Sequence, residues 1–312
     1  MEVQRTIERP GELRGIGLQS GEEIRVAFKP APPNTGIIFN VSNNHVDWYS
    51  IKASITNLIG VNQSTVLGTE GVVLNTVEHV LSALYGSKID NLYIDVEGSE
   101  LPILDGSCCQ FVEYFSMLGI RSQPALRKFI KITREIFVGN KDRHIHAYPS
   151  DNLCIDYEIL FDHPAIQCQR FTLNSDLNAF FTDIAPARTF GFLKEIKVLR
   201  KKGYLKGGSL QNAVVVGRRR ILNPELRYAD EFVRHKVLDA LGDLYLLGYP
   251  LLGHIKIYRG GHSLHANFVR YLIENPECWV LVNSSNHESA EYAEQSELSE
   301  LTIEQPIQTI SA

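Results

Sequence analysis

The pair of side chains best suited to chemistry is His235 and Asp239, which stand four positions apart in the segment Phe232–Leu247. Residues four apart on an α-helix lie on one face, about 6 Å apart along the axis, so both side chains can reach one ion. Imidazole nitrogens and carboxylate oxygens are ordinary zinc ligands, and a catalytic zinc site uses three protein ligands and a water. The same spacing is typical of a pair on a helix surface, so the two residues alone leave both interpretations open.

A third ligand could come from His79, because Glu78 precedes it near the start of a predicted helix, Val77–Leu84, for which Thr76 is the candidate cap. A carboxylate next to a metal ligand is placed to act on the water of the metal. The alternative is an ordinary first turn of a helix, where a glutamate is favoured by the helix dipole.

Two further residues could assist such a site. His262 follows Gly260-Gly261, and glycines there let the backbone turn sharply and come close to a ligand; the alternative is a simple surface turn. Asp243 lies one helical turn beyond Asp239 and could orient a neighbouring group, although the direction drifts by about 80° over eight residues of a helix. It could equally be a solvated helix residue.

The elements that must hold these residues recur in similar order in both halves of the chain. Strands are predicted near Glu22–Lys29, Ile37–Val41, Asn91–Val96, Phe129–Ile132, Ile155–Leu160 and His254–Tyr258, and apolar and polar residues alternate in the first, the third and the last of them. Helical spacing of apolar residues predicts helices over Phe111–Leu118 and Phe232–Leu247. The segment Ser122–Ala125, which contains Pro124, is the expected domain boundary.

The helices that carry His79 and His235 also share a loose pattern, because Glu78–Leu84 resembles Arg234–Leu241 once one residue is allowed for. Either the likeness is a chance similarity of two amphipathic helices, or two similar α+β domains face each other with a site between them.

The composition is that of a globular protein. The chain has 312 residues, of which 44% are hydrophobic and 21% charged, and this length is enough for about two domains. The net charge of −5 leaves no chain-wide basic field, which argues against nucleic acid as a partner. The five cysteines are odd in number and form no CxxC pair. Since neither a signal peptide nor an apolar run of ~18–20 residues stands out, we expect a cytoplasmic protein without stable membrane insertion.

The C-terminal segment has a different composition. No lysine or arginine follows Arg270, apolar residues become sparse from Asn283, and glutamates recur at intervals of three or four residues. Residues 283–312 are therefore predicted to form an acidic, flexible tail, to which we assign no chemistry.

Several segments taken together resemble a known family. The motifs that carry the resemblance are Gly15–Gly21, Pro30–Ile37, Thr76–Leu84, Pro102–Ser107, His163–Ile166, Ala187–Phe192, Lys206–Ala213, Arg234–Asp239 and Gly261-His262. From about Gln4 to about Asn267, the chain is similar to the UDP-3-O-acyl-N-acetylglucosamine deacetylases, zinc enzymes of lipid A biosynthesis in Gram-negative bacteria.

The resemblance implies a role for each candidate residue. His79, His235 and Asp239 would bind one zinc ion per chain, with water in the fourth position. Glu78 would act as the general base that takes a proton as the water attacks the acetamide carbonyl.

The remaining roles concern the charge and the protons of the reaction. His262, as a cation, would stabilise developing charge and protonate the leaving amine, with Asp243 holding it. Thr189 would hydrogen-bond the oxyanion, and Lys236 would help hold the substrate or the charge near it. The implied reaction hydrolyses the N-acetyl group and releases acetate and UDP-3-O-acyl-glucosamine, the committed step of lipid A biosynthesis. A monomer acting on this small UDP-linked acylated amino sugar is expected.

The fold implied by the resemblance is α+β, with two domains of similar topology, each a β-sheet with a helical layer, packed helix layer to helix layer. The first domain would span residues 1–122 and supply the base and one ligand. The second would span residues 126–276, supply the other two ligands and the acid, and contain an insert at about residues 189–216.

The long acyl chain of the substrate needs an apolar channel, which the family builds from this insert. The insert residues that fit such use are Phe190, Phe192, Leu193, Ile196, Leu199, Ala213 and Val215, together with Gly208 and Ser209. An amphipathic helix packed on the core would need the same residue types, so this alternative stays open. Phe161 matches a family position near the uracil, and Lys141 or Arg143 could meet phosphate.

Two positions depart from the family pattern. Gln19 stands where the motif usually has histidine, in a stretch that supplies no ligand, so the chemistry is expected to survive. Cys108-Cys109 stands where small residues are usual, and both thiols are expected near the active cleft, where thiol reagents would inhibit. A catalytically idle relative that binds lipid or sugar nucleotide, and a metal hydrolase of another substrate, are the alternative functions.

Overall fold

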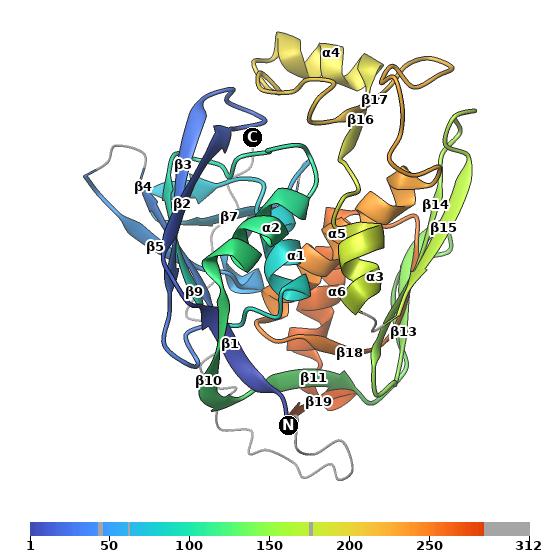
Figure 1. Ribbon diagram of the computed structural model, residues 1–312. Coiled ribbons are helices and arrows are strands. Elements are labelled where there is room, and N and C mark those ends of the chain that lie inside the picture. Colours follow the sequence, from blue (N-terminus) through green and yellow to red (C-terminus); the bar gives the residue numbers. More distant parts are fainter. Residues whose placement is uncertain (43–45, 62, 175–176, 284–312) are drawn as a thin grey trace.

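Two β-sheets form opposite sides of the molecule, and most of the helices lie between them (Figure 1). The structure is a computed structural model that describes residues 1–42, 46–61, 63–174 and 177–283. The predicted acidic tail, from residue 284 onward, lies outside these residues. The α+β class expected from the sequence is confirmed.

We call the first sheet the N-terminal sheet. Apolar side chains at alternate positions of its strands are buried, as Ile24, Val26 and Phe28 show, which are at most 2% exposed. Its strands, in spatial order, are β2 (Gly11–Ile16), β3 (Glu23–Pro30), β9 (Leu92–Glu97), β4 (Ile37–Ser42) and β5 (Tyr49–Lys52). A smaller sheet contains β6 (Leu58–Gly60), β7 (Val66–Thr69) and β8 (Val72–Leu74).

The second sheet, which we call the C-terminal sheet, has β18 (Leu251–Tyr258) at its centre. Its other strands are β12 (Ile136–Asn140), β13 (Arg143–Tyr148), β11 (Lys128–Ile132), β19 (Trp279–Asn283), β14 (Leu153–Leu160) and β15 (Cys168–Leu173). β18 runs antiparallel to β13 and parallel to β14. All six predicted strands are confirmed, and their predicted ends coincide with the observed ends or differ from them by at most three residues.

The layer between the sheets contains the helices that carry the candidate residues. They are α1 (Glu78–Gly86), α2 (Cys109–Leu118), α5 (Glu231–Leu244) and α6 (His262–Glu274). The shorter helical segments are α3 (Leu177–Ala179), the π-helix η2 (Phe180–Ile184) and the 3₁₀-helices η1 (Ile55–Asn57), η3 (Tyr245–Leu247) and η4 (Pro276–Cys278). None of the helices in the described ranges is long and apolar enough to cross a bilayer.

Helices α1 and α5 pack directly against each other, although about 150 residues of chain separate them. Gly242 makes this contact close, because a Cβ atom there would overlap the carbonyl oxygen of Glu78. α5 also packs against α6 and against strands of the C-terminal sheet, which explains why most of its residues are buried. The contact brings the start of α1 next to the middle of α5.

One local prediction is wrong. Thr76 does not cap α1: Val77 precedes the helix without a side-chain cap, and Thr76 has a φ of 62°, whereas a capping residue needs extended backbone. The segment around Pro124, which was expected to mark a domain boundary, is part of β10 (Ile120–Leu126), which pairs with β1 (Val3–Ile7). The register shifts in this ladder, and a proline is tolerated at such an irregularity because it donates no hydrogen bond. The division into two domains stays a prediction.

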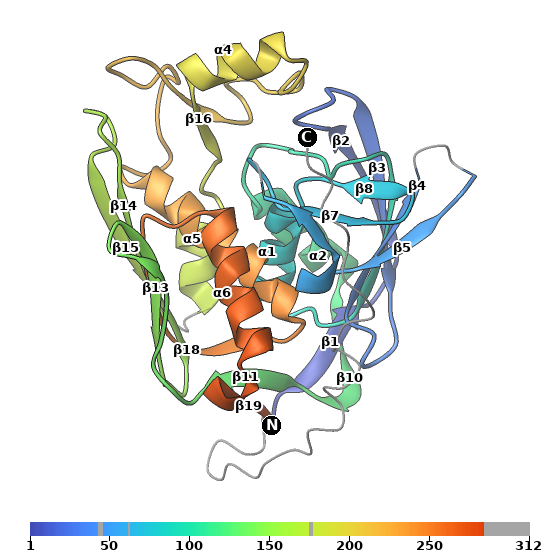
Figure 2. The same ribbon diagram turned by 180° about the vertical axis from the view of Figure 1, so that it is seen from behind.

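The predicted insert stands apart from both sheets. It contains β16 (Phe190–Phe192), α4 (Leu193–Lys201) and β17 (Val214–Val216), and β16 pairs with β17 in parallel. In the views from front and back, α4 lies at the top of the molecule, above the helical layer (Figure 2). No residue of α4 is buried, so the alternative of a helix packed on the core is wrong.

We predict that Gly242→Ala lowers the free energy of unfolding by about 1–3 kcal/mol, because the new methyl group must push the backbone of Glu78 away. A gain in helix propensity of about 1 kcal/mol offsets only part of this cost. Gly60→Ala is the control, since its Cβ would meet only the side chain of Val66, at an ordinary 3.5 Å. Urea unfolding measures both variants, and equal stability of the two would contradict the prediction.

Candidate active site and metal centre

Three side chains that lie far apart in the sequence form one buried cluster. His79, His235 and Asp239 are 4%, 2% and 2% exposed, and each offers a ligand atom within 4.8 Å of the others. Nε2 of His235 lies 3.2 Å from Oδ1 of Asp239, and Nε2 of His79 lies 3.9 Å from the same oxygen. The structure therefore brings together the three residues that the sequence analysis proposed as ligands.

Local contacts orient the ring of His235. Its Nδ1 lies 3.0 Å from the carbonyl oxygen of Ala187 and donates a hydrogen bond to it, which leaves the lone pair of Nε2 facing the cluster. An outer hydrogen bond of this kind fixes the tautomer of metal-binding histidines. The ring of His79 meets that of His235 edge to face, with centroids 5.1 Å apart.

The protonation states of the cluster suit a divalent cation. Burial, together with the neighbouring His235, lowers the pKa of His79 to about 3, so its imidazole is neutral. Burial alone would raise the pKa of Asp239, but His235 and Lys236 hold it well below its usual range. Two imidazoles and one carboxylate, buried together, form the donor set of a catalytic zinc site, so the residues present fit such an ion.

Lys236 is tied to this cluster. Its Nζ donates a hydrogen bond of 2.7 Å to Oδ2 of Asp239 and lies 5.7 Å from the ring centroid of Phe190. Burial by itself would lower the pKa of Lys236, but Asp239 raises it. The lysine therefore stays cationic and offsets the charge of the carboxylate.

Glu78 lies beside the cluster at the first turn of α1. Its side chain is 2% exposed and accepts a hydrogen bond of 3.0 Å from the backbone N–H of Thr65. Burial raises the pKa of Glu78 to about 7, although the cationic His262 acts in the opposite direction. A carboxylate whose pKa lies near neutrality is suited to general base catalysis.

His262 and Asp243 form a second group beside the cluster, and Nε2 of His262 lies 3.9 Å from Oδ2 of Asp239. Nδ1 of His262 donates to Oδ2 of Asp243 over 2.8 Å. Burial would lower the pKa of His262, but the carboxylate of Asp243 raises it to about 9. His262 is therefore a cation near neutrality, and it can give up a proton from Nε2 while Asp243 holds its other nitrogen.

Sequence analysis missed three residues that complete this group. Oγ1 of Thr65 donates to Asp243, and Nδ1 of His265 donates to the same carboxylate over 2.7 Å. Nε2 of His265 in turn lies 3.1 Å from the hydroxyl of Tyr157. The spacing of His265 from His262, three residues on one helix, was a usable signal; nothing in the sequence marks Thr65 or Tyr157.

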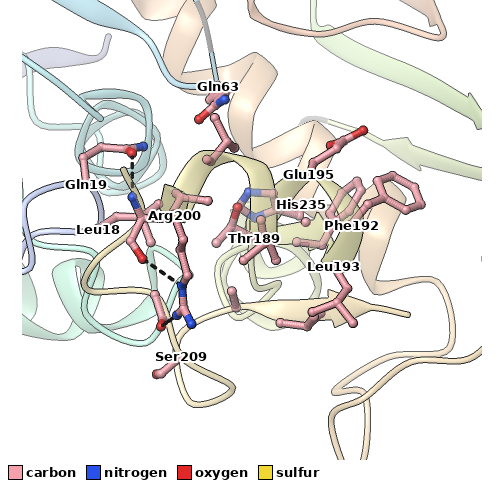
Figure 3. A pocket seen from close by; sticks show the side chains of 18 of the residues that line it. Leu18, Gln19, Gln63, Thr189, Phe192, Leu193, Glu195, Arg200, Ser209 and His235 are labelled. Carbon is pink, nitrogen blue, oxygen red and sulfur yellow. Dashed lines mark hydrogen bonds between the residues drawn. The ribbon is translucent and has the colours of Figure 1, made fainter. Parts of the chain in front are cut away.

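A cavity of about 920 Å³ opens over the cluster. Besides Glu78, His262 and the three candidate ligands, it is lined by Thr189 and Lys236 and by nine of the residues proposed to contact the substrate: Phe161, Phe190, Phe192, Leu193, Ile196, Gly208, Ser209, Ala213 and Val215. Leu199 lines it too. Figure 3 shows Thr189 and His235 near the middle of the view, with residues of the insert such as Phe192, Leu193 and Ser209 around them. A chamber whose wall combines titratable groups with apolar side chains suits an amphiphilic substrate.

Loops from the first half of the chain hold the insert in place. Oε1 of Gln19 accepts a hydrogen bond of 3.3 Å from the backbone N–H of Leu205, and Arg200 bonds the carbonyl oxygen of Gly208 (Figure 3). The buried carboxylate of Glu100 fixes the Gln19 loop by accepting from the backbone N–H groups of Gln19 and Ser20. Gln19 thus has a structural contact that the sequence did not suggest.

Thr189 is positioned by the start of α5. Its neighbour Arg188 forms an ion pair with Glu231, in which Nε lies 2.8 Å from Oε1, and Glu231 is fully buried. The backbone N–H of Thr189 bonds the carbonyl oxygen of Gly106 over 2.7 Å. The threonine is therefore fastened to both halves of the chain.

Four other candidates lie away from the cavity wall. Cys108 is buried, and burial raises the pKa of its thiol well above the ordinary value; Cys109 is half-buried, with a pKa raised by burial to about 11. Neither thiol lines the cavity. Lys141 and Arg143 do not line it either, and Arg143 bonds the carbonyl oxygen of Arg259.

Comparison with known proteins gives a consistent answer. Residues 4–274 match the family model described as LpxC, UDP-3-O-acyl N-acetylglycosamine deacetylase. A UDP-3-O-acyl-N-acetylglucosamine deacetylase of Syntrophotalea carbinolica is 41% identical over 285 residues, which cover 91% of this chain and 92% of that protein. The proteins of the same name from Nautilia profundicola and Myxococcus xanthus are 43% and 40% identical, over 86% and 91% of this chain and 91% of each relative.

We predict that the purified protein holds one divalent ion and that His79→Ala and Asp239→Ala each lose it. Loss of even an outer partner of a metal ligand costs about 10–100-fold in affinity, so loss of a ligand should cost at least as much. Metal content after dialysis, measured by mass spectrometry, tests this. His144→Ala, which changes a histidine of β13 outside the cluster, is the control; full metal retention in either cluster variant would remove that residue from the site.

Proposed function

Because the chain belongs to the LpxC family of UDP-3-O-acyl N-acetylglycosamine deacetylases, we propose that its cavity holds UDP-3-O-acyl-N-acetylglucosamine with the N-acetyl group against the buried cluster. The protein is a deacetylase of lipid A biosynthesis. It hydrolyses the acetamide and releases acetate and UDP-3-O-acyl-glucosamine. The observation that carries the proposal is the convergence of a candidate base, a candidate acid and a candidate metal-binding cluster in the wall of one largely apolar chamber.

The proposed cofactor is one zinc ion per chain, held by His79, His235 and Asp239. When bound, zinc supplies Lewis acidity and lowers the pKa of a coordinated water to about 7. The donor set supports this choice, because two imidazoles and a carboxylate are ligands that zinc accepts readily.

The side chains around the cluster then carry the protons. Glu78 takes a proton from the attacking water as the oxygen of that water bonds to the acetamide carbon. The hydroxyl of Thr189 donates a hydrogen bond to the oxygen that becomes negative. His262 gives its Nε2 proton to the sugar nitrogen as the carbon–nitrogen bond breaks, while Asp243 holds the other nitrogen of the ring. Each such proton transfer contributes typically 10²–10⁴-fold.

The rest of the substrate is proposed to extend along the cavity. The acyl chain would lie among the apolar residues of the insert, such as Phe192, Leu193 and Ile196, and the uracil near Phe161. Lys236 would balance charge beside the reacting group. We further propose that the protein acts as a monomer in the cytoplasm on this small-molecule substrate, without nucleic acid as a partner.

Glu78→Gln should lower kcat by about 10²–10⁴-fold, because the amide cannot accept the proton, while metal content stays at one ion per chain. Acetate release from the purified substrate measures the rate. Glu195→Gln, a change of the same type at the exposed end of the cavity, is the control and should keep most of the activity. A decrease of less than about tenfold in Glu78→Gln would show that another group is the base.

The dependence of kcat/KM on pH should be bell-shaped. Activity rises as Glu78, with a pKa of about 7, loses its proton, and falls as His262, with a pKa of about 9, loses its own; a bound cation lowers both values further. In Asp243→Asn the carboxylate that raises the pKa of His262 is gone, so the falling limb should move to lower pH. A falling limb that stays in place would contradict the assignment of His262 as the acid.

A further inference from the structure

The insert that lines the cavity also carries a concentration of positive charge. Residues 190–222 contain five lysines, four arginines and a single acidic residue, Glu195, which gives this stretch a net charge of +8 in a chain whose total is −5. All nine cationic side chains, which lie between Lys194 and Arg220, are exposed. We call these nine side chains the basic cap.

No acidic side chain in the described part of the chain neutralises the charge of the basic cap. Within the described ranges, none of the nine side chains forms an ion pair with an acidic residue. Arg200 uses its guanidinium for the carbonyl oxygens of Leu205 and Gly208, which do not cancel its charge. The basic cap is therefore free to bind an external anionic partner.

Large apolar side chains stand exposed among these cations. Val198 is 50% exposed, Tyr204 52%, Leu210 42% and Leu222 39%. Val198, Leu210 and Leu222 also line the cavity, so the exposed apolar groups mark its mouth. These apolar side chains would add nothing to the binding of a purely ionic partner. They would strengthen the binding of a partner that has an apolar interior beneath a charged surface.

Helix α4 lies between the cavity and the outside of the molecule. Leu193, Ile196 and Leu199 face the cavity, whereas Lys197 and Lys201 do not line it. The helix has no buried residue and lies at the outer end of the molecule in both views (Figures 1 and 2). The helix therefore turns Leu193, Ile196 and Leu199 to the cavity and presents lysines on its outer side, where an anionic surface can attract them.

From this arrangement we infer that the basic cap docks on the surface of a bilayer that contains anionic lipids, with the mouth of the cavity turned toward the membrane. Clustered lysines and arginines are attracted to anionic headgroups, and the exposed apolar residues can enter the boundary between headgroups and acyl chains. The remainder of the chain carries a net negative charge and is repelled by the same surface. This repulsion orients the molecule so that the basic cap faces the membrane. Binding is reversible, because the cap has no segment that could span the membrane.

Vesicle sedimentation with the full-length protein tests the inference. Vesicles of phosphatidylglycerol and phosphatidylcholine should bind it, vesicles of phosphatidylcholine alone should not, and binding should weaken as salt is raised. The variant Lys197→Gln/Lys201→Gln/Lys202→Gln should bind about 100-fold more weakly, since each lysine near an anionic surface contributes about fivefold.

The matched control removes three exposed cations outside the cap, in Lys52→Gln/Arg121→Gln/Arg134→Gln, and should bind almost as well as the unchanged protein. Circular dichroism establishes that both variants are folded. Equal binding of the cap variant and the control, or binding of the unchanged protein that does not depend on salt, would overturn the inference. So would failure of the unchanged protein to bind anionic vesicles at low salt, and retention on an acidic protein instead would make the cap a protein-docking surface.

A second measurement needs no loss of charge. Tyr204→Trp places a fluorescent probe among the exposed apolar residues, and its emission should shift to shorter wavelength on anionic vesicles as the indole leaves water. An unchanged spectrum in the presence of bound vesicles would show that the apolar residues stay in water and would overturn the proposed orientation.

Discussion

The close packing of α1 on α5 is the contact on which the whole site depends. It brings His79 of one helix within reach of His235 and Asp239 of the other, and it works only because Gly242 has no side chain to hold the backbone of Glu78 away. A shift of one ångström between these helices would separate a candidate base and one candidate ligand from the other two. Catalytic geometry tolerates little misplacement, so the core of the protein and its chemistry are built on the same contact.

Burial of several charged groups in one place is the second constraint, because isolated charges are costly to remove from water. The structure solves this with pairs: Lys236 beside Asp239, and His262 beside Asp243. Burial and pairing together also shift the pKa values of neighbouring groups in ways that suit different roles. Burial brings the pKa of Glu78 close to neutral pH, while the carboxylate of Asp243 keeps His262 cationic. A candidate base and a candidate acid can therefore coexist at one pH.

Much of the fold and of the candidate site could be predicted from the sequence, and the failures have physical reasons. The spacing of His235 and Asp239 fixed their common face, because a helix is a rigid repeat. The alternation of apolar and polar residues predicted strands because a strand, like a helix, is a regular repeat. The left-handed backbone at Thr76 and the strand that contains Pro124 depend on contacts with distant segments, which a local pattern does not contain. The hydroxyls of Thr65 and Tyr157 reach the site only through tertiary packing, so no spacing reveals them.

The separation of wall from chemistry in the large cavity has a consequence for how this protein can diversify. The apolar wall comes mostly from one continuous stretch, whereas the reacting groups lie on helices of the interior. Substitutions at Ile196 or Leu199 can lengthen or shorten the chamber without moving any group that handles a proton. Under the proposed function, the preference for one acyl chain over another can therefore vary among relatives of this protein while the proposed catalytic residues stay the same.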